Sequence, residues 1–156
     1  MLKEGDLVPE VKLVGLEGQP IGPADFRGQK LVIYFYPKDD TSGCTKEACG
    51  FQEALPDFGT LDAAVFGVSI LDTRSKSKFA TKYDLTFPLL ADEDHAVAEK
   101  YGVWQEKSMY GRKYMGVARV TYLIDADGTV ARRWDTVKVD THPAEVLAAV
   151  EALKAS

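Results

Sequence analysis

Three runs of apolar and β-branched residues mark the hydrophobic pattern of this chain, at residues 31–36, 64–70 and 118–124. The first run shows no polar alternation and predicts a central strand that is covered on both faces. The other two predict further buried strands. Residues 125–128 have the composition of a tight turn with glycine at the fourth position, so residues 129–134 predict the return strand of a hairpin.

Polar and amphipathic stretches between and after these strands predict four helices. Residues 44–55 predict the first helix, which we expect Pro56 to close. Residues 74–83 predict a polar, lysine-rich helix, and residues 93–101 predict a shorter one. Residues 143–155 predict a final amphipathic helix that starts with a proline suited to the first turn.

The N-terminal part, residues 5–28, is rich in glycine and proline and contains short apolar stretches, which predict a small hairpin. After it come strand, helix, strand and helix, and then a hairpin and a helix. This order implies α/β layers and matches a thioredoxin-like sheet with an added N-terminal hairpin. With 156 residues the chain fits one domain, 1–156, that can bury a core without disulfides.

Charge and composition restrict the expected partners. Lys and Arg number 19 against 24 Asp and Glu, a net charge of −5 that disfavours nucleic acid and anionic membranes. No apolar run approaches membrane-spanning length, and the first six residues carry acids and no apolar stretch, which argues against a secretory signal. We therefore expect a cytoplasmic protein that binds neither nucleic acid nor a membrane.

The chain has two cysteines, Cys44 and Cys49. A disulfide scaffold would need more cysteines, so this close pair indicates redox chemistry or metal binding in a reducing compartment. Cys44 lies in the first turn of its predicted helix, where free N–H groups and the helix dipole favour a negative charge. Such a position lowers the pKa of a thiol and so yields the nucleophilic thiolate. The alternative is a small buried cysteine without chemistry.

The residues around Cys44 carry a motif. Residues 36–45 read Tyr-Pro-Lys-Asp-Asp-Thr-Ser-Gly-Cys-Thr and resemble the peroxiredoxin active-site pattern Pro-x-x-x-Thr-x-x-Cys. The continuation Lys-Glu-Ala-Cys is similar to the bacterioferritin comigratory protein (peroxiredoxin Q) subfamily. Further similarity lies at residues 101–104, 114–116 and 123–128, so the resemblance extends over nearly the whole chain. One departure is Ser42, where many members have proline; it leaves the reactive positions intact.

This resemblance implies roles for five residues. Cys44 corresponds to the peroxidatic cysteine, which attacks the peroxide and becomes a sulfenic acid, and Cys49 corresponds to the resolving cysteine. Thr41 and Pro37 match the residues that orient the peroxide and shield the sulfur. Arg119 matches the arginine that polarises the thiolate and the substrate.

The function implied is reduction of hydrogen peroxide and organic hydroperoxides, with thioredoxin or a similar dithiol as the reductant and no cofactor or metal. An intramolecular disulfide removes the need for a partner subunit, so we expect a monomer.

Each assigned residue also has a simpler interpretation. The position of Arg119 in an apolar run would by itself favour an edge-strand arginine whose head reaches water. Thr41 could serve only as a helix cap and Pro37 only as the end of a strand, although both roles are compatible with catalysis. Cys49 could be a buried apolar filler, with an external thiol as the resolving group.

The spacing of the two cysteines poses a geometric problem. On an intact helix, five residues rotate the side chain by roughly 140° and separate the Cα atoms by about 8–9 Å. A disulfide needs Cα atoms closer than about 7 Å. A bond between Cys44 and Cys49 therefore requires the first turns of the helix to unwind, which Gly50 should make easier.

Three other classes of protein compete with this reading. A thioredoxin-type oxidoreductase uses two residues between its cysteines, whereas this chain has four. A metal site built from Cys44, Cys49 and a histidine lacks a recognisable zinc spacing. The sequence does not exclude a non-enzymatic redox-relay or chaperone protein with the same fold. We expect the group Lys76, Lys78 and Lys82 to form a solvated face and His95 to lie at a solvated helix start. His142 is expected at a helix entry, and Trp104 and Trp134 in the core or in a pocket wall.

Overall fold

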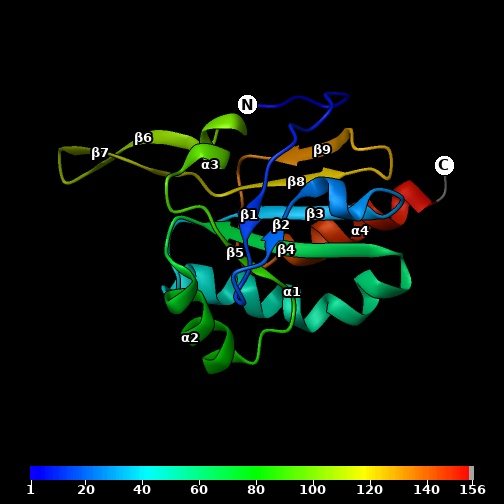
Figure 1. Ribbon diagram of the computed structural model, residues 1–156, viewed down its shortest axis with the longest axis horizontal. Helices are drawn as coiled ribbons and strands as arrows, with labels where there is room; N and C mark the ends of the chain where they lie inside the picture. The colour runs from blue at the N-terminus through cyan, green and yellow to red at the C-terminus, as the bar shows by residue number, and fades with distance from the viewer. Residues whose placement is uncertain (155–156) are drawn as a thin grey trace.

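The computed structural model of the protein describes residues 1–154 and has a central sheet with helices on both faces (Figure 1). Seven strands form this sheet in the order β2-β1-β5-β4-β3-β8-β9, and β6 and β7 form a separate two-stranded sheet. The strands are β1 (Leu13–Val14), β2 (Pro20–Ile21), β3 (Lys30–Phe35), β4 (Ala63–Ser69), β5 (Leu89–Ala91), β6 (Trp104–Met109), β7 (Arg112–Val117), β8 (Val120–Ile124) and β9 (Val130–Trp134). The helices are the 3₁₀ helix η1 (Pro23–Phe26), α1 (Ser42–Thr60), α2 (Thr73–Tyr83), α3 (Ala96–Lys100) and α4 (His142–Lys154).

Strand β3 lies in the middle of the sheet, parallel to β4 and antiparallel to β8. On one face its Tyr34 packs with Phe51 of α1 and Val146 of α4 in one core cluster. On the other face its Phe35 packs in a second cluster that includes Val97 of α3. Because both faces are covered, the strand needs no polar alternation, which confirms the prediction of a central strand.

The predicted N-terminal hairpin is present as β1 and β2, which pair antiparallel. Strand β1 also pairs with β5 through Val14 and Ala91, so the hairpin extends the central sheet at one edge. The α/β layers and the added hairpin therefore match the prediction from the order of the elements.

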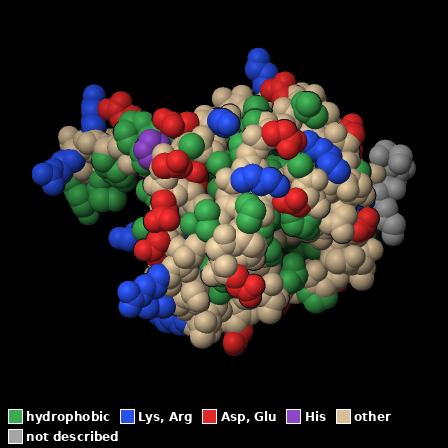
Figure 2. All heavy atoms as spheres, in the orientation of Figure 1, with side chains coloured by type: hydrophobic (Ala, Val, Ile, Leu, Met, Phe, Trp, Pro, Cys, Tyr) green, Lys and Arg blue, Asp and Glu red, His purple; other side chains and the backbone are tan. Residues whose placement is uncertain are grey.

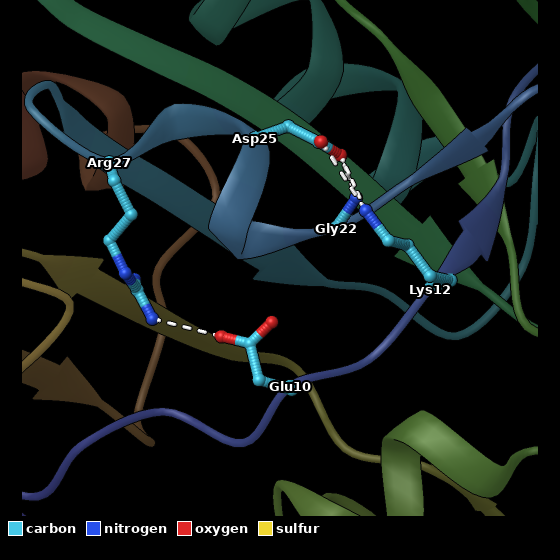
Figure 3. Close-up of polar contacts among 5 residues, drawn as sticks. All are labelled: Glu10, Lys12, Gly22, Asp25 and Arg27. Carbon is cyan, nitrogen blue, oxygen red and sulfur yellow. Dashed lines mark hydrogen bonds and ion pairs between the residues drawn. The ribbon is translucent and has the colours of Figure 1, made fainter.

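Two polar contacts tie the segment before β1 to η1 (Figure 3). Asp25 accepts hydrogen bonds from the backbone N–H of Gly22 at 2.8 Å and from Lys12 Nζ at 3.1 Å. Arg27 Nη2 donates to Glu10 at 3.2 Å. Because these ion pairs are largely exposed to solvent, they add little to the stability of the fold.

Helix α1 extends beyond its predicted end at residue 55 and contains Pro56 in its interior. Proline has no N–H, so the helix gives up one backbone hydrogen bond at that point. The continuation buries Phe58 completely against the core, and this burial offsets the missing bond. The expectation that Pro56 closes the helix is therefore wrong.

The sequence pattern did not predict β5, β6 or β7. Strands β6 and β7 form a hairpin that projects from the rest of the molecule (Figure 2). Tyr110 at its tip is almost fully exposed, and the exposed faces mix charged and apolar residues, so no buried stripe marks these strands in the sequence. The predicted final helix agrees with α4 to within a residue at its start, whereas residue 155 lies outside the described part of the chain.

One of the three α2 lysines that we expected in solvent is buried. Lys78 and Lys82 are exposed, whereas Lys76 has no accessible surface. Its ammonium group lies 3.5 Å from the carboxylate of Asp39, which compensates the charge within the protein.

Candidate active site

Cys44 lies in the first turn of α1, directly after the loop that leaves β3. Thr41 is the N-cap residue, with extended backbone, and its carbonyl accepts the hydrogen bond of the Thr45 N–H at 2.8 Å. The Cys44 side chain is 1% exposed, so its sulfur is enclosed next to the helix N-terminus. This confirms the predicted location of the thiol at a helix start, where the positive end of the helix dipole lies.

Arg119 contacts both the sulfur and a carboxylate. It precedes β8, the neighbour of β3, so its side chain extends toward the start of α1. Its Nη2 donates to Cys44 Sγ at 3.2 Å, and its Nη1 donates to Glu47 Oε1 at 2.7 Å. The planar guanidinium thus uses two of its N–H groups to hold a fixed orientation beside the sulfur. Arg119 is therefore not an edge-strand arginine whose head is directed only to water.

Glu47 is the site residue that the sequence analysis missed. It follows Cys44 by three residues on α1, which places both side chains on one face of the helix. Burial raises its pKa to about 7, although the Arg119 guanidinium opposes this shift. In turn burial disfavours the charged form of Arg119, but Glu47 and Cys44 raise the pKa of the guanidinium overall. The spacing of three residues from Cys44 was the one signal for Glu47 in the sequence.

Thr41 and Pro37 lie in the segment between β3 and α1. The Thr41 hydroxyl donates to the carbonyl of Lys38 at 3.1 Å and makes no side-chain cap to the helix. Thr41 is exposed, and Pro37 is partly buried just after β3. Thr41 thus occupies the N-cap position without satisfying a helix N–H through its side chain.

Cys49 lies on the same helix and is not bonded to Cys44, since both thiols are free. Its side chain is partly buried, and burial raises the pKa of its thiol. On an intact helix its Cα lies about 8–9 Å from that of Cys44. The structure therefore brings Arg119 to Cys44 and leaves Cys49 apart.

Strand β6 contributes a lysine to the electrostatic surroundings of Arg119 and Cys44. Burial lowers the pKa of Lys107 on β6, and the positive charge of Arg119 lowers it further, while Cys44 opposes the shift. Lys107 therefore lies within electrostatic range of the thiol and adds a second positive charge near it.

Comparison with known proteins assigns the chain to a family. The AhpC/TSA family matches residues 5–133. The chain belongs to this peroxiredoxin family. Among curated relatives, peroxiredoxin Bcp of Bacillus subtilis is 43% identical over 143 residues, which cover 92% of this chain and 91% of that protein. Peroxiredoxin Bcp of Escherichia coli is 42% identical over 146 residues, 94% of each chain.

Solved structures of peroxiredoxin Q proteins superpose on this chain. A mutant of Xylella fastidiosa PrxQ superposes with a TM-score of 0.93 at 34% identity, over 98% of both chains. Peroxiredoxin Q of Xanthomonas campestris gives a TM-score of 0.88 at 39% identity, over 92% of this chain and 91% of that one. These matches confirm the predicted thioredoxin-like fold and the peroxiredoxin Q group. The protein is thus a thiol-dependent peroxidase, which uses a hydroperoxide and a thioredoxin-type reductant.

Proposed function

We propose that Cys44 is the peroxidatic nucleophile of this peroxidase. Its thiolate attacks one oxygen of the hydroperoxide, the O–O bond breaks, and the sulfur becomes a sulfenic acid. The other oxygen leaves with the electron pair of that bond and takes up a proton to give water or an alcohol. The observation that carries the proposal is the contact of 3.2 Å between Arg119 Nη2 and the enclosed Cys44 sulfur.

Arg119 is proposed to stabilise the charge that develops on sulfur and on the leaving oxygen. A guanidinium that is already oriented does this without reorganisation during the reaction. Glu47 holds one edge of the guanidinium, so it fixes the direction of the remaining N–H groups. Thr41 and Pro37 are proposed to orient the peroxide and to shield the sulfur; the N-cap position of Thr41, three residues before Cys44, supports this for Thr41.

Cys49 is proposed to resolve the sulfenic acid. Its sulfur attacks the Cys44 sulfur, the S–O bond breaks, and hydroxide leaves as water after taking up a proton. A dithiol such as thioredoxin then reduces the disulfide and is itself oxidised. These steps draw their electrons from thiols alone and use no cofactor or metal.

We infer that organic hydroperoxides are substrates together with hydrogen peroxide. The bacterioferritin comigratory protein of Xanthomonas campestris, studied for alkyl peroxide reduction in trapped intermediate and ligand complexes, supports this: it superposes with a TM-score of 0.89 at 36% identity, over 96% of this chain and 99% of that one.

We further propose that residues 1–156 form one domain that acts as a monomer in the cytoplasm. The two core clusters cover opposite faces of one sheet, which supports a single domain. An intramolecular disulfide needs no second subunit, and a reducing compartment keeps its thiols available. Among the described residues, no helix is long and apolar enough to span a membrane.

The test is the intact mass before and after one equivalent of peroxide, together with peroxide consumption coupled to thioredoxin. The parent chain should lose two hydrogen atoms as the disulfide forms, and Cys49→Ser should gain one oxygen atom as the sulfenic acid. Cys44→Ser should show neither change and consume no peroxide. Turnover of Cys44→Ser close to that of the parent would overturn the assignment.

A further inference from the structure

Lys76 is a charged residue of α2 that the peroxidase chemistry does not use. Its side chain has no accessible surface, and its ammonium group donates to Ser69 at the end of β4 and lies 3.5 Å from Asp39 Oδ2. The same nitrogen lies 5.5 Å from the centre of the Tyr36 ring. Burying an ammonium group is unfavourable unless it is paired, and burial lowers the pKa of Lys76 to about 8 while Asp39 opposes the shift. The question is therefore what the paired partner of this buried lysine holds in place.

Asp39 lies in the loop between β3 and α1, two residues after Pro37 and two before Thr41. It is buried, and its Oδ1 accepts from the Tyr36 hydroxyl at 2.5 Å. Its Oδ2 accepts from Ser75 Oγ at 2.7 Å and faces the Lys76 ammonium group. Both carboxylate oxygens therefore have partners, and those on α2 fix the loop to that helix.

The next residue anchors the same loop a second time. Asp40 has a positive φ of 58°, in the left-handed region that Asp adopts more readily than most residues other than glycine. Its carboxylate accepts from Lys82 Nζ at 2.9 Å and from the Tyr83 hydroxyl at 2.8 Å, both at the C-terminal end of α2. This outer pair is exposed and so holds the loop less firmly than the buried pair.

The loop sets the geometry of the site through the backbone. The Thr41 hydroxyl donates to the carbonyl of Lys38, and the Thr41 carbonyl accepts the first hydrogen bond of α1. A shift of Asp39 would therefore move Thr41 and the first turn that carries Cys44. Displacement of about 1 Å at a reacting group can lower a rate by roughly a hundredfold.

We propose that Lys76 and Asp39 are positioning residues, whose buried ion pair holds the loop 37–41 on α2 and thereby keeps Thr41 and Cys44 in the arrangement that receives the peroxide. The proposal rests on the proposed role of Cys44 as the nucleophile. It gives α2, which contributes no catalytic residue, a function in the reaction.

The test compares two reactions of the same thiol. Reduction of peroxide requires an oriented substrate, whereas alkylation by iodoacetamide requires only an accessible thiolate. In Lys76→Met and Asp39→Asn we expect the ratio of the peroxide rate to the alkylation rate to fall at least about tenfold. Lys78→Met, an exposed lysine of the same helix, is the matched control and should keep the parent ratio.

The double variant Lys76→Met/Asp39→Asn separates positioning from stability. Removing one partner leaves an unpaired buried charge and destabilises the fold, whereas removing both charges can restore stability. We expect the double variant to regain thermal stability and to keep the lowered rate ratio. Ser75→Ala removes only one donor to Asp39 and should give a smaller fall in the same ratio. It replaces the charge variants as the test if they do not fold.

A parent-like ratio in the stable double variant, or in Ser75→Ala where the charge variants do not fold, would overturn the proposal. The role of Cys44 is tested separately, because Cys44→Ser removes the thiol and leaves the Lys76–Asp39 pair intact. Loss of activity in Cys44→Ser together with a parent-like ratio in the double variant would refute the positioning role alone.

Discussion

Gly50 of α1 lies so close to Pro143 of α4 that a Cβ added to the glycine would come within 2.7 Å of the proline Cγ. The rigid pyrrolidine ring cannot rotate away from such an atom. Gly50 directly follows Cys49, so the two helices approach each other beside the proposed resolving cysteine. This contact explains why glycine occupies this position despite its low helix propensity.

We therefore expect Gly50→Ala to destabilise the protein, by about 1–2 kcal/mol, because overpacking against Pro143 outweighs the gain in helix propensity of about 0.5–1 kcal/mol. Unfolding in urea measures the change. Gly59→Ala on the same helix is the control, since an added Cβ there meets nothing within 4 Å. If Gly50→Ala stabilised the protein as much as Gly59→Ala, overpacking against Pro143 would be ruled out.

The core strands could be predicted because strands that are buried on both faces have continuous apolar sequences. The run at residues 31–36 corresponds to β3, and that at residues 64–70 to β4, each displaced by one residue. Strand β5 has only three residues and therefore no period to detect. The β6–β7 hairpin has no fully buried face, so neither helical nor strand periodicity marks it.

From the residues alone, only those parts of the site that are neighbours along the chain could be predicted. The motif places Thr41 and Cys44 within one turn of each other, but the contact of Cys44 with Arg119 joins residues 75 positions apart and needed the family resemblance. Glu47 and Lys76 were missed because charged residues are rarely buried, and only tertiary contacts supply the partners that permit it.

Arg119→Lys should lower the rate of peroxide reduction by about 10²–10³-fold, although it keeps the positive charge. An ammonium group lacks the planar fork that lets Arg119 donate to Cys44 and Glu47 at once. Stopped-flow measurement of the first oxidation step checks this. Arg112→Lys on the exposed hairpin is the control. A parent-like rate in both Arg119→Lys and Arg119→Ala would remove Arg119 from the reaction.

Glu47 should make the stability of the protein depend on pH. Burial raises its pKa from 4.5 to about 7, so between these values the folded protein binds a proton that the unfolded chain does not. This contribution to stability is present in full below pH 4.5 and is lost as the pH rises to about 7, a change of up to about 3 kcal/mol.

Glu47→Gln should abolish this decline, because glutamine stays neutral while its amide oxygen can still accept from Arg119. Urea unfolding from pH 4.5 to 7.5 measures the slope. The exposed Glu53 lies on the same helix, so Glu53→Gln should leave the slope unchanged. An unaltered slope in Glu47→Gln would show that Glu47 is already ionised in the folded protein throughout this range.

Disulfide formation should unwind the start of α1. Cys44 and Cys49 lie in one continuous helix, where their Cα atoms are about 8–9 Å apart and their side chains are rotated by roughly 140°. A disulfide holds Cα atoms within about 7 Å, so the helical hydrogen bonds of this segment must break before the sulfurs can bond. The disulfide form should therefore exchange its amide hydrogens faster at residues 42–52 than the reduced form.

Hydrogen exchange followed by mass spectrometry on the two forms measures this difference. Residues 30–35 of β3 provide an internal reference, because their ladder hydrogen bonds do not depend on α1. Cys49→Ser, oxidised under the same conditions, cannot form the bond and should keep the protection of the reduced helix. Equal protection of residues 42–52 in the reduced and disulfide forms would show that α1 need not open, and would contradict this prediction.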